Sequence, residues 1–158
     1  IRICATLNKN ISPNRNVKKL LDLEKKRGFF KTSKYKKFSK DVIKSKNNLL
    51  NILQKIKKEG KNIVGIGCPG RSITLLSYCN INRDIIDYIA EQSSSLKLNL
   101  FTPNTHIPVL SADALYELKP DYVLILAWNF AKPIMQMHKK YSEQVGQFIL
   151  PMPHPEVV

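Results

Sequence analysis

Apolar residues recur at helical spacing through the first two fifths of the chain. From Lys40 to Glu59 they form one stripe and lysines fill the opposite face, which predicts an amphipathic helix ended by Gly60. The stripe consists of Val42, Ile43, Leu49, Leu50, Ile52, Leu53 and Ile56. Val17 to Lys26 predicts a shorter helix ended by Gly28, and residues 2–7 predict a short strand.

The pattern changes after residue 61, where short apolar runs alternate with helical stretches. The runs predict strands at 62–67, 85–90, 121–127 and 147–150. The stretches between them predict helices at 71–79, 112–118 and 133–143, with 100–110 extended and rich in turns. This alternation favours an α/β fold with a mainly parallel sheet. Since the run Tyr122 to Leu126 is almost wholly apolar, we expect helices on both sheet faces.

Length and charge divide the chain in the same way. Its 158 residues suit one domain, so we expect residues 1–61 to belong to the same domain as the core at 62–158. Residues 1–62 hold 19 basic and four acidic residues, a net charge of +15, whereas the rest has −1. Such a basic face is typical of a nucleic-acid or anionic-membrane surface, or of a solvated helix. Only five of the 26 basic residues are Arg, which favours the solvated helix.

The remaining composition excludes several classes. No apolar run approaches the roughly 18 residues of a membrane span, and no signal peptide is evident. Three widely spaced cysteines and three scattered histidines argue against a zinc site and for a reducing, cytoplasmic location. The first Met is Met135, so we expect the sequence to be a piece of a longer protein.

A glycine turn between the first core strand and its helix is the first candidate site. Gly65, Gly67 and Gly70 nearly match the Gly-x-Gly-x-x-Gly spacing, which allows backbone N–H groups at a helix start to face a phosphate. Arg71 adds a cation and Ser72 a hydroxyl. A tight turn that binds nothing is the alternative interpretation.

Three further positions could touch a ligand. Glu91 follows the second predicted core strand, where an acid can reach a ribose hydroxyl. Thr105 and His106 lie in the polar segment 101–108, and His106 is a weak candidate for an acid or base. Trp128 and Asn129 follow the most apolar strand. No Ser or Cys lies next to a His, so no nucleophile–base pair is evident and the chain looks incomplete as an enzyme.

Four motifs together resemble the C-terminal domain of the S-adenosylmethionine-dependent sugar C-methyltransferases. They are Gly-Ile-Gly-Cys-Pro-Gly-Arg at 65–71, Thr-Pro-Asn-Thr-His-Ile-Pro at 102–108, Lys-Pro-Asp-Tyr-Val-Leu-Ile-Leu-Ala-Trp-Asn-Phe at 119–130 and Gln-Phe-Ile-Leu-Pro-Met-Pro at 147–153. The resemblance covers about residues 1–155, with Arg71 where Lys is usual and Asn104 where Gly is usual.

The resemblance implies a Rossmann-like, three-layer domain preceded by a basic helical segment. It also implies a nucleotide-linked deoxysugar as substrate and an upstream methyltransferase domain, absent from this sequence, that binds S-adenosylmethionine and carries the catalytic residues. This chain would bind no cofactor or metal and would hold the substrate through the glycine turn, Thr105, His106, Trp128 and Asn129.

Two other functions stay open from the residues alone. A Rossmann-like module could bind a dinucleotide as a regulator, although Pro69 removes one N–H from the turn. A non-specific nucleic-acid-binding domain could use residues 9–61, although the neutral second half of the chain counts against it. We expect no membrane partner and no specific nucleic acid.

Overall fold

The computed structural model describes residues 3–158. Their contacts form two compact units, divided between Val42 and Ile43. Helix α2 (Thr32–Lys58) runs through this division and contributes residues to both units. The two units therefore divide about 20 residues before the change of sequence pattern at residue 62. That change lies just before the first strand of the core.

The first unit is helical. Helix α1 (Arg15–Lys26) begins after Asn14, whose side-chain oxygen accepts the N–H of Asn16 at 2.9 Å, and Gly28 follows it at φ +78°. The predicted helix at 17–26 is confirmed. The strand predicted at 2–7 is wrong for residues 3–7, which are exposed and pair with none of the described strands, and residue 2 lies outside the described residues.

The second unit is built on a six-stranded sheet of order β3-β2-β1-β4-β5-β6. The strands are β1 (Ile63–Ile66), β2 (Ile89–Glu91), β3 (Val109–Ser111), β4 (Tyr122–Ile125), β5 (Gln147–Leu150) and β6 (Glu156–Val157). All neighbouring pairs are parallel except β5 and β6. The sheet is therefore mainly parallel, as the alternation of strands and helices predicts.

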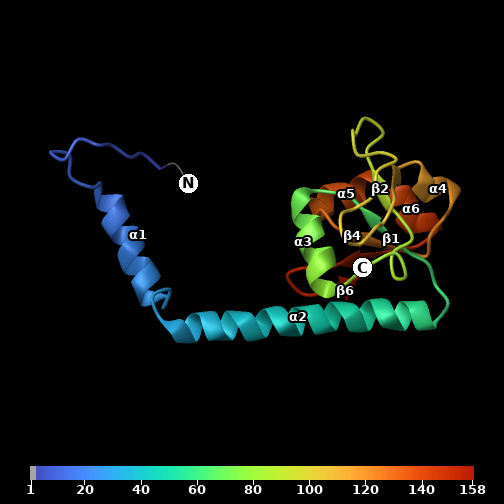
Figure 1. Cartoon of the computed structure of the whole chain (residues 1–158), viewed down its shortest axis with the longest axis horizontal. Helices are drawn as coiled ribbons and strands as arrows, with labels where there is room; N and C mark the ends of the chain where they lie inside the picture. The colour runs from blue at the N-terminus through green and yellow to red at the C-terminus, as the bar shows by residue number, and fades with distance from the viewer. Residues whose placement is uncertain (1–2) are drawn as a thin grey trace. The chain divides into compact units, whose positions relative to one another are not determined.

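Helices cover both faces of this sheet (Figure 1). On one face, Leu49, Leu53 and Ile56 of α2 share a buried cluster with α3 (Gly70–Cys79) and with alternate residues of the strands. On the other, the strands pack against α4 (Ala114–Glu117), α5 (Ala131–Met137) and α6 (Lys139–Gln144). The three-layer α/β fold is confirmed, with the lysine-rich helix laid on the sheet by its apolar stripe.

Several predicted bounds are wrong for local reasons. The strand predicted at 85–90 begins only at Ile89, because the N–H groups of Ile85 and Ile86 bond back to the Asn82 carbonyl in a turn. Its end includes Glu91, which was expected just past it. The helix predicted at 133–143 is two helices, α5 and α6, that meet at His138 (φ −105°, ψ 30°).

Two strands and one helical extension were not predicted. Strands β3 and β6 have three and two residues, too short to show a period, and β3 lies within the segment expected to be extended. Helix α2 begins at Thr32 rather than near Lys40. Its first turns carry no buried residue, so the pattern of apolar positions did not predict that the helix extends to them.

Candidate functional site

The carboxyl ends of β1, β2 and β4 meet at one edge of the second unit. The connection from β1 passes to β2 on one side, whereas β4 lies on its other side, so the strand order reverses between β1 and β4. Ligands of open parallel sheets bind at such a reversal. Gly67 follows β1, Glu91 ends β2, and Trp128 follows β4 within a short 3-10 helix (Trp128–Phe130).

The glycine turn after β1 is tightly packed. Gly67 has φ +77°, and a Cβ there would lie 2.9 Å from the Cβ of Ala127, so both the conformation and the space require glycine. The N–H of Gly67 donates to the Ala90 carbonyl at 2.8 Å, and the N–H of Cys68 donates to Oε2 of Glu91 at 2.7 Å. These two N–H groups are therefore not free for a phosphate.

The free donors lie at the end of the turn, where α3 begins. The first N–H groups of a helix have no partner within the helix. Among the bonds formed within residues 3–158, only that of Ser72 is satisfied, by the Pro69 carbonyl at 2.8 Å. The N–H groups of Gly70 and Arg71 remain, and a Cβ on Gly70 would meet no atom within 4 Å. An anion could approach the helix dipole at this point.

Arg71 and Trp128 face one another across the reversal of strand order. The guanidinium carbon of Arg71 lies 6.0 Å from the centre of the Trp128 ring, at the outer limit of a cation–π contact. Arg71 is exposed and takes part in none of the ion pairs formed within residues 3–158. Gly70, Arg71 and Trp128 are called the switch-point site below.

Glu91 connects the second strand to the turn. Its Oε1 accepts the N–H of Gln92 at 3.1 Å, in addition to the bond from Cys68. Lys97 lies 3.8 Å from Oε2 and donates to the Cys68 carbonyl at 2.6 Å. Lys97 thus offsets the charge of Glu91, and Arg71 adds a positive charge at this edge.

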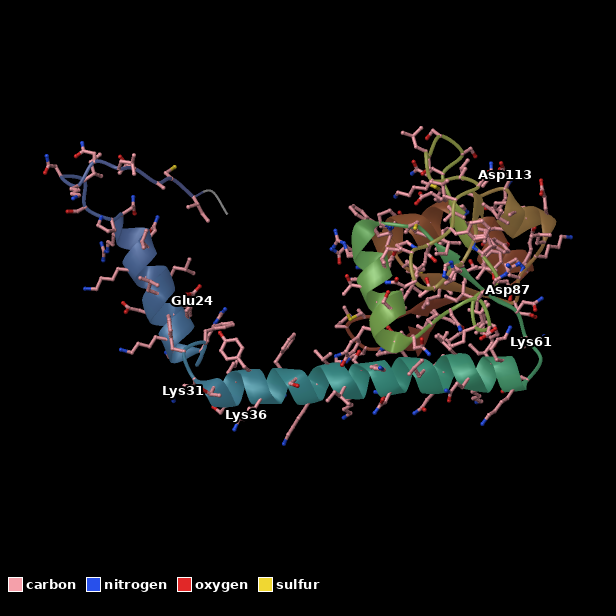
Figure 2. The ribbon with its side chains drawn as sticks, in the orientation of Figure 1. Glu24, Lys31, Lys36, Lys61, Asp87 and Asp113 are labelled. Carbon is pink, nitrogen blue, oxygen red and sulfur yellow. The ribbon has the colours of Figure 1, made fainter. Side chains whose placement is uncertain are left out.

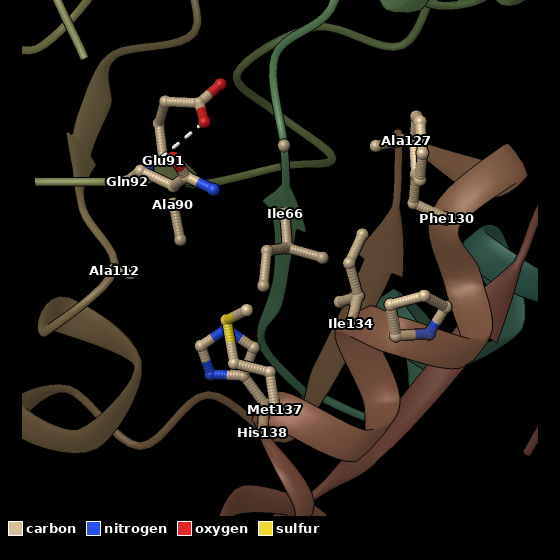
Figure 3. Close-up of a pocket in the computed structure, with 12 residues that line it drawn as sticks. Ile66, Ala90, Glu91, Gln92, Ala112, Ala127, Phe130, Ile134, Met137 and His138 are labelled. Carbon is tan, nitrogen blue, oxygen red and sulfur yellow. Dashed lines mark hydrogen bonds between the residues drawn. The ribbon is translucent and has the colours of Figure 1, made fainter. Parts of the chain in front are cut away.

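A cavity of about 310 Å³ opens beside the switch-point site (Figure 3). Gly67 and Ala127 belong to its lining, and Glu91 lies across from Phe130 and Ile134. Most of the wall is apolar, from Ile66, Ala90, Ala112, Ala127, Phe130 and Ile134. Glu91, Gln92 and His138 are the polar side chains among the described residues that line it.

His138 is a lining residue that sequence reasoning missed. It is 8% exposed, and burial lowers the pKa of its imidazole below the usual value. Its Nδ1 lies 3.0 Å from the hydroxyl of Tyr116, which follows β3 in the chain. The spacing of these two residues in the sequence does not predict their contact. They meet because α4 and α5 lie on the same face of the sheet.

The structure does not bring all the predicted site residues together. The carbonyl of Pro108 accepts the N–H of Ile89, so the chain enters β3 at the amino end of β2. Thr105 and His106 come just before this point and lie toward the amino ends of the strands. The Thr105 hydroxyl is 2.7 Å from that of Thr102, and His106 is exposed at φ +51°.

Three other predicted site residues lie in a strand, in the core or on the surface. Gly65 lies within β1, where a Cβ would be 2.8 Å from Leu126, so it gives packing room rather than a ligand contact. Ser72 is fully buried and donates its hydroxyl to the Pro69 carbonyl at 2.7 Å. Asn129 is exposed beside Trp128.

Within residues 3–158, no group of three or more His, Cys, Asp or Glu side chains is placed to hold a metal ion. None of the helices in that part of the chain is long and apolar enough to cross a membrane.

Comparison with known proteins identifies the family of the chain. The chain is 28% identical over 142 residues to the C-methyltransferase NovU of Streptomyces niveus. The aligned region covers 90% of this chain and 34% of that protein, so the chain spans about a third of the length of this relative. A family model, described as the C-methyltransferase C-terminal domain, matches residues 1–153. The match extends over almost the whole chain, and the chain therefore belongs to the family of C-methyltransferase C-terminal domains.

Proposed function

We propose that this chain is the substrate-holding domain of an S-adenosylmethionine-dependent C-methyltransferase that acts on a nucleotide-linked sugar. The observation that supports this most is the switch-point site, which combines N–H groups at a helix start, an aromatic face and Arg71, a cation that forms no ion pair within residues 3–158. In the proposal, Gly70 and Arg71 bind the diphosphate, and Trp128 forms the floor beside it.

The residues at this edge fit a phosphate better than they fit the methyl donor. S-Adenosylmethionine carries a cationic sulfonium, and Arg71, which forms no ion pair within residues 3–158, is also a cation. The carboxylate of Glu91 accepts two backbone N–H groups, and Lys97 offsets its charge, so it offers no net negative charge to a sulfonium. We therefore assign the donor and the acid–base residues to another part of a longer protein, and none to this chain.

The same geometry weakens the competing proposal of a regulatory dinucleotide module. A dinucleotide turn offers several consecutive N–H groups to the pyrophosphate. Here Pro69 has none, and those of Gly67 and Cys68 are already bonded. Titration with a nicotinamide dinucleotide separates the two proposals. The free cysteines fit a reducing compartment, so we propose a cytoplasmic location.

Calorimetry with a nucleoside diphosphate hexose tests the proposal. In the proposal the substrate binds between two domains, and this chain supplies only one of them. The ligand then still loses its freedom of motion on binding but makes fewer contacts, so we expect a Kd in the high micromolar range or weaker. Arg71→Ala should weaken binding about tenfold, since a charge-assisted bond to phosphate contributes about 1.5 kcal/mol. Arg83→Ala, which removes the same charge from an exposed residue after the far end of α3, is the matched control.

Equal affinity of the wild type and Arg71→Ala would remove Arg71 from the site. An equal loss in Arg71→Ala and Arg83→Ala would show that only net charge matters and would contradict a defined phosphate site.

A further inference from the structure

We propose that the cavity between the sheet edge and α5 takes the nucleobase of the substrate, so that this domain reads the nucleoside end and leaves the sugar outside. The inference rests on the proposed function, because it uses the diphosphate position at the switch-point site.

The size and lining of the cavity favour a base over a sugar. A volume of about 310 Å³ is at the lower end of the range for ligand pockets, so it suits one ring system rather than a whole nucleotide sugar. A sugar carries a hydroxyl on most carbons and would bury several of them against alanine and isoleucine without partners. A base has two apolar faces and a polar edge, which matches apolar walls with few polar side chains.

The walls are arranged to enclose a flat group. Ala90 and Ala112 on one side have the smallest side chains after glycine, and Phe130 and Ile134 of the opposite side are bulky (Figure 3). His138 lies at another part of the wall with its Nδ1 held by Tyr116, so Nε2 is the atom that can serve the polar edge of a base.

The position of Glu91 connects this cavity to the diphosphate. Glu91 lines the cavity and also bonds the Cys68 N–H, two residues before Gly70. A ribose between a base in the cavity and a diphosphate at Gly70 and Arg71 would therefore pass Glu91. A carboxylate has about four acceptor positions, and the Cys68 and Gln92 N–H groups take two of them, so capacity for a ribose hydroxyl remains.

The test compares uridine diphosphate with inorganic pyrophosphate by calorimetry on the whole chain. We expect uridine diphosphate to bind about tenfold tighter, equivalent to about 1.4 kcal/mol from the nucleoside. Ala112→Leu, which fills the cavity, should remove this advantage and leave pyrophosphate affinity unchanged. Phe130 is 61% exposed, so Phe130→Ala should fold normally and reduce the advantage even if Ala112→Leu does not fold.

Methyl NMR locates the nucleoside independently. Uridine diphosphate should shift the methyl signals of Ile66 and Ile134, which line the cavity, and leave that of Ile149, buried on the opposite face of the sheet, unchanged. Equal affinity for the two probes, without shifts at Ile66 and Ile134, would overturn the inference but leave the phosphate site standing. No binding of either probe would overturn both. Binding of S-adenosylhomocysteine in the cavity in place of uridine diphosphate would also overturn the inference, by assigning the cavity to the methyl donor.

Discussion

Glu91 shows how one side chain can shape a proposed phosphate site without contacting the phosphate. Its two oxygens hold the N–H groups of Cys68 and Gln92, and thereby fix the turn after β1 to the end of β2. This leaves the proposed phosphate binding to the last residues of the turn, Gly70 and Arg71. A carboxylate that tightens the turn thus also decides which of its N–H groups an anion can use.

The three thiols should differ strongly in reactivity. Burial raises the pKa of the Cys68 and Cys79 thiols, whereas Cys4 is exposed. Because the thiolate is the nucleophile, a raised pKa lowers the reactive fraction at neutral pH and moves labelling of the buried thiols to higher pH. In native protein we expect an alkylating reagent to modify Cys4 first, as measured by mass spectrometry.

Cys4→Ser is the control for this labelling experiment and should remove the fast phase. Fast labelling of Cys68 at neutral pH would show that the turn opens readily and would contradict the packing described for Gly67 and Glu91.

The sequence predicted, for a physical reason, some of the residues that the structure places together at the candidate site. The positions of Gly67, Arg71 and Trp128 follow from one rule, that loops after parallel strands carry ligands. The same rule failed for Thr105 and His106, because β3 has three residues and the chain enters it from a turn near the amino end of β2. His138 and Tyr116 could not be paired, since only the three-dimensional fold brings them within 3.0 Å.

At the scale of elements, helix α2 is the clearest case of a pattern that specifies packing. Leu49, Leu53 and Ile56 recur at helical spacing and are all buried in the second unit. The strands were harder to predict from the sequence pattern. Strands β2 and β3 have three residues each, and their register is set by pairing with β1 and with each other. Periodicity can show long elements, whereas short strands depend on neighbours far away in the sequence.

Leu53→Ala should test the docking of α2. The side chain of Leu53 is fully buried, so we expect the free energy of unfolding to fall by about 2–5 kcal/mol. Urea unfolding followed by circular dichroism gives this value. Lys58→Ala on the exposed face of the same helix is the control, and an equally small effect of both substitutions would contradict the packing of α2 on the sheet.

At the scale of the whole molecule, the basic charge and the candidate site belong to different parts of the chain. The apolar side chains of α1 are 40–50% exposed, and lysines such as Lys31 and Lys36 extend into solvent from the first unit (Figure 2). The switch-point site lies in the second unit, within residues 63–158, where seven basic and eight acidic residues nearly balance.

We therefore expect nucleic-acid binding to be weak, independent of sequence and released by salt. Lysines neutralise phosphates but do not read bases, so affinity should fall steeply as salt rises. Fluorescence anisotropy with two unrelated oligonucleotides at low and physiological salt measures this. Nanomolar, sequence-selective binding at physiological salt would show that the basic unit has a recognition role.

The isolated chain should transfer no methyl group. It belongs to a C-terminal domain family and spans about a third of a C-methyltransferase, and we assign the methyl donor to the remaining part. Incubation with labelled S-adenosylmethionine and a nucleotide-linked ketosugar should give no labelled product. Product formation by the chain alone would overturn the assignment of the chemistry to another domain.

The most direct test of the proposed function is to map the binding of a nucleoside diphosphate hexose by amide and indole NMR shifts. We predict shifts at the Gly70 and Arg71 amides and at the indole N–H of Trp128, with none at His106 or in α1. Shifts confined to His106 or α1, or no shifts at millimolar ligand, would contradict a substrate-holding site at the carboxyl edge of the sheet.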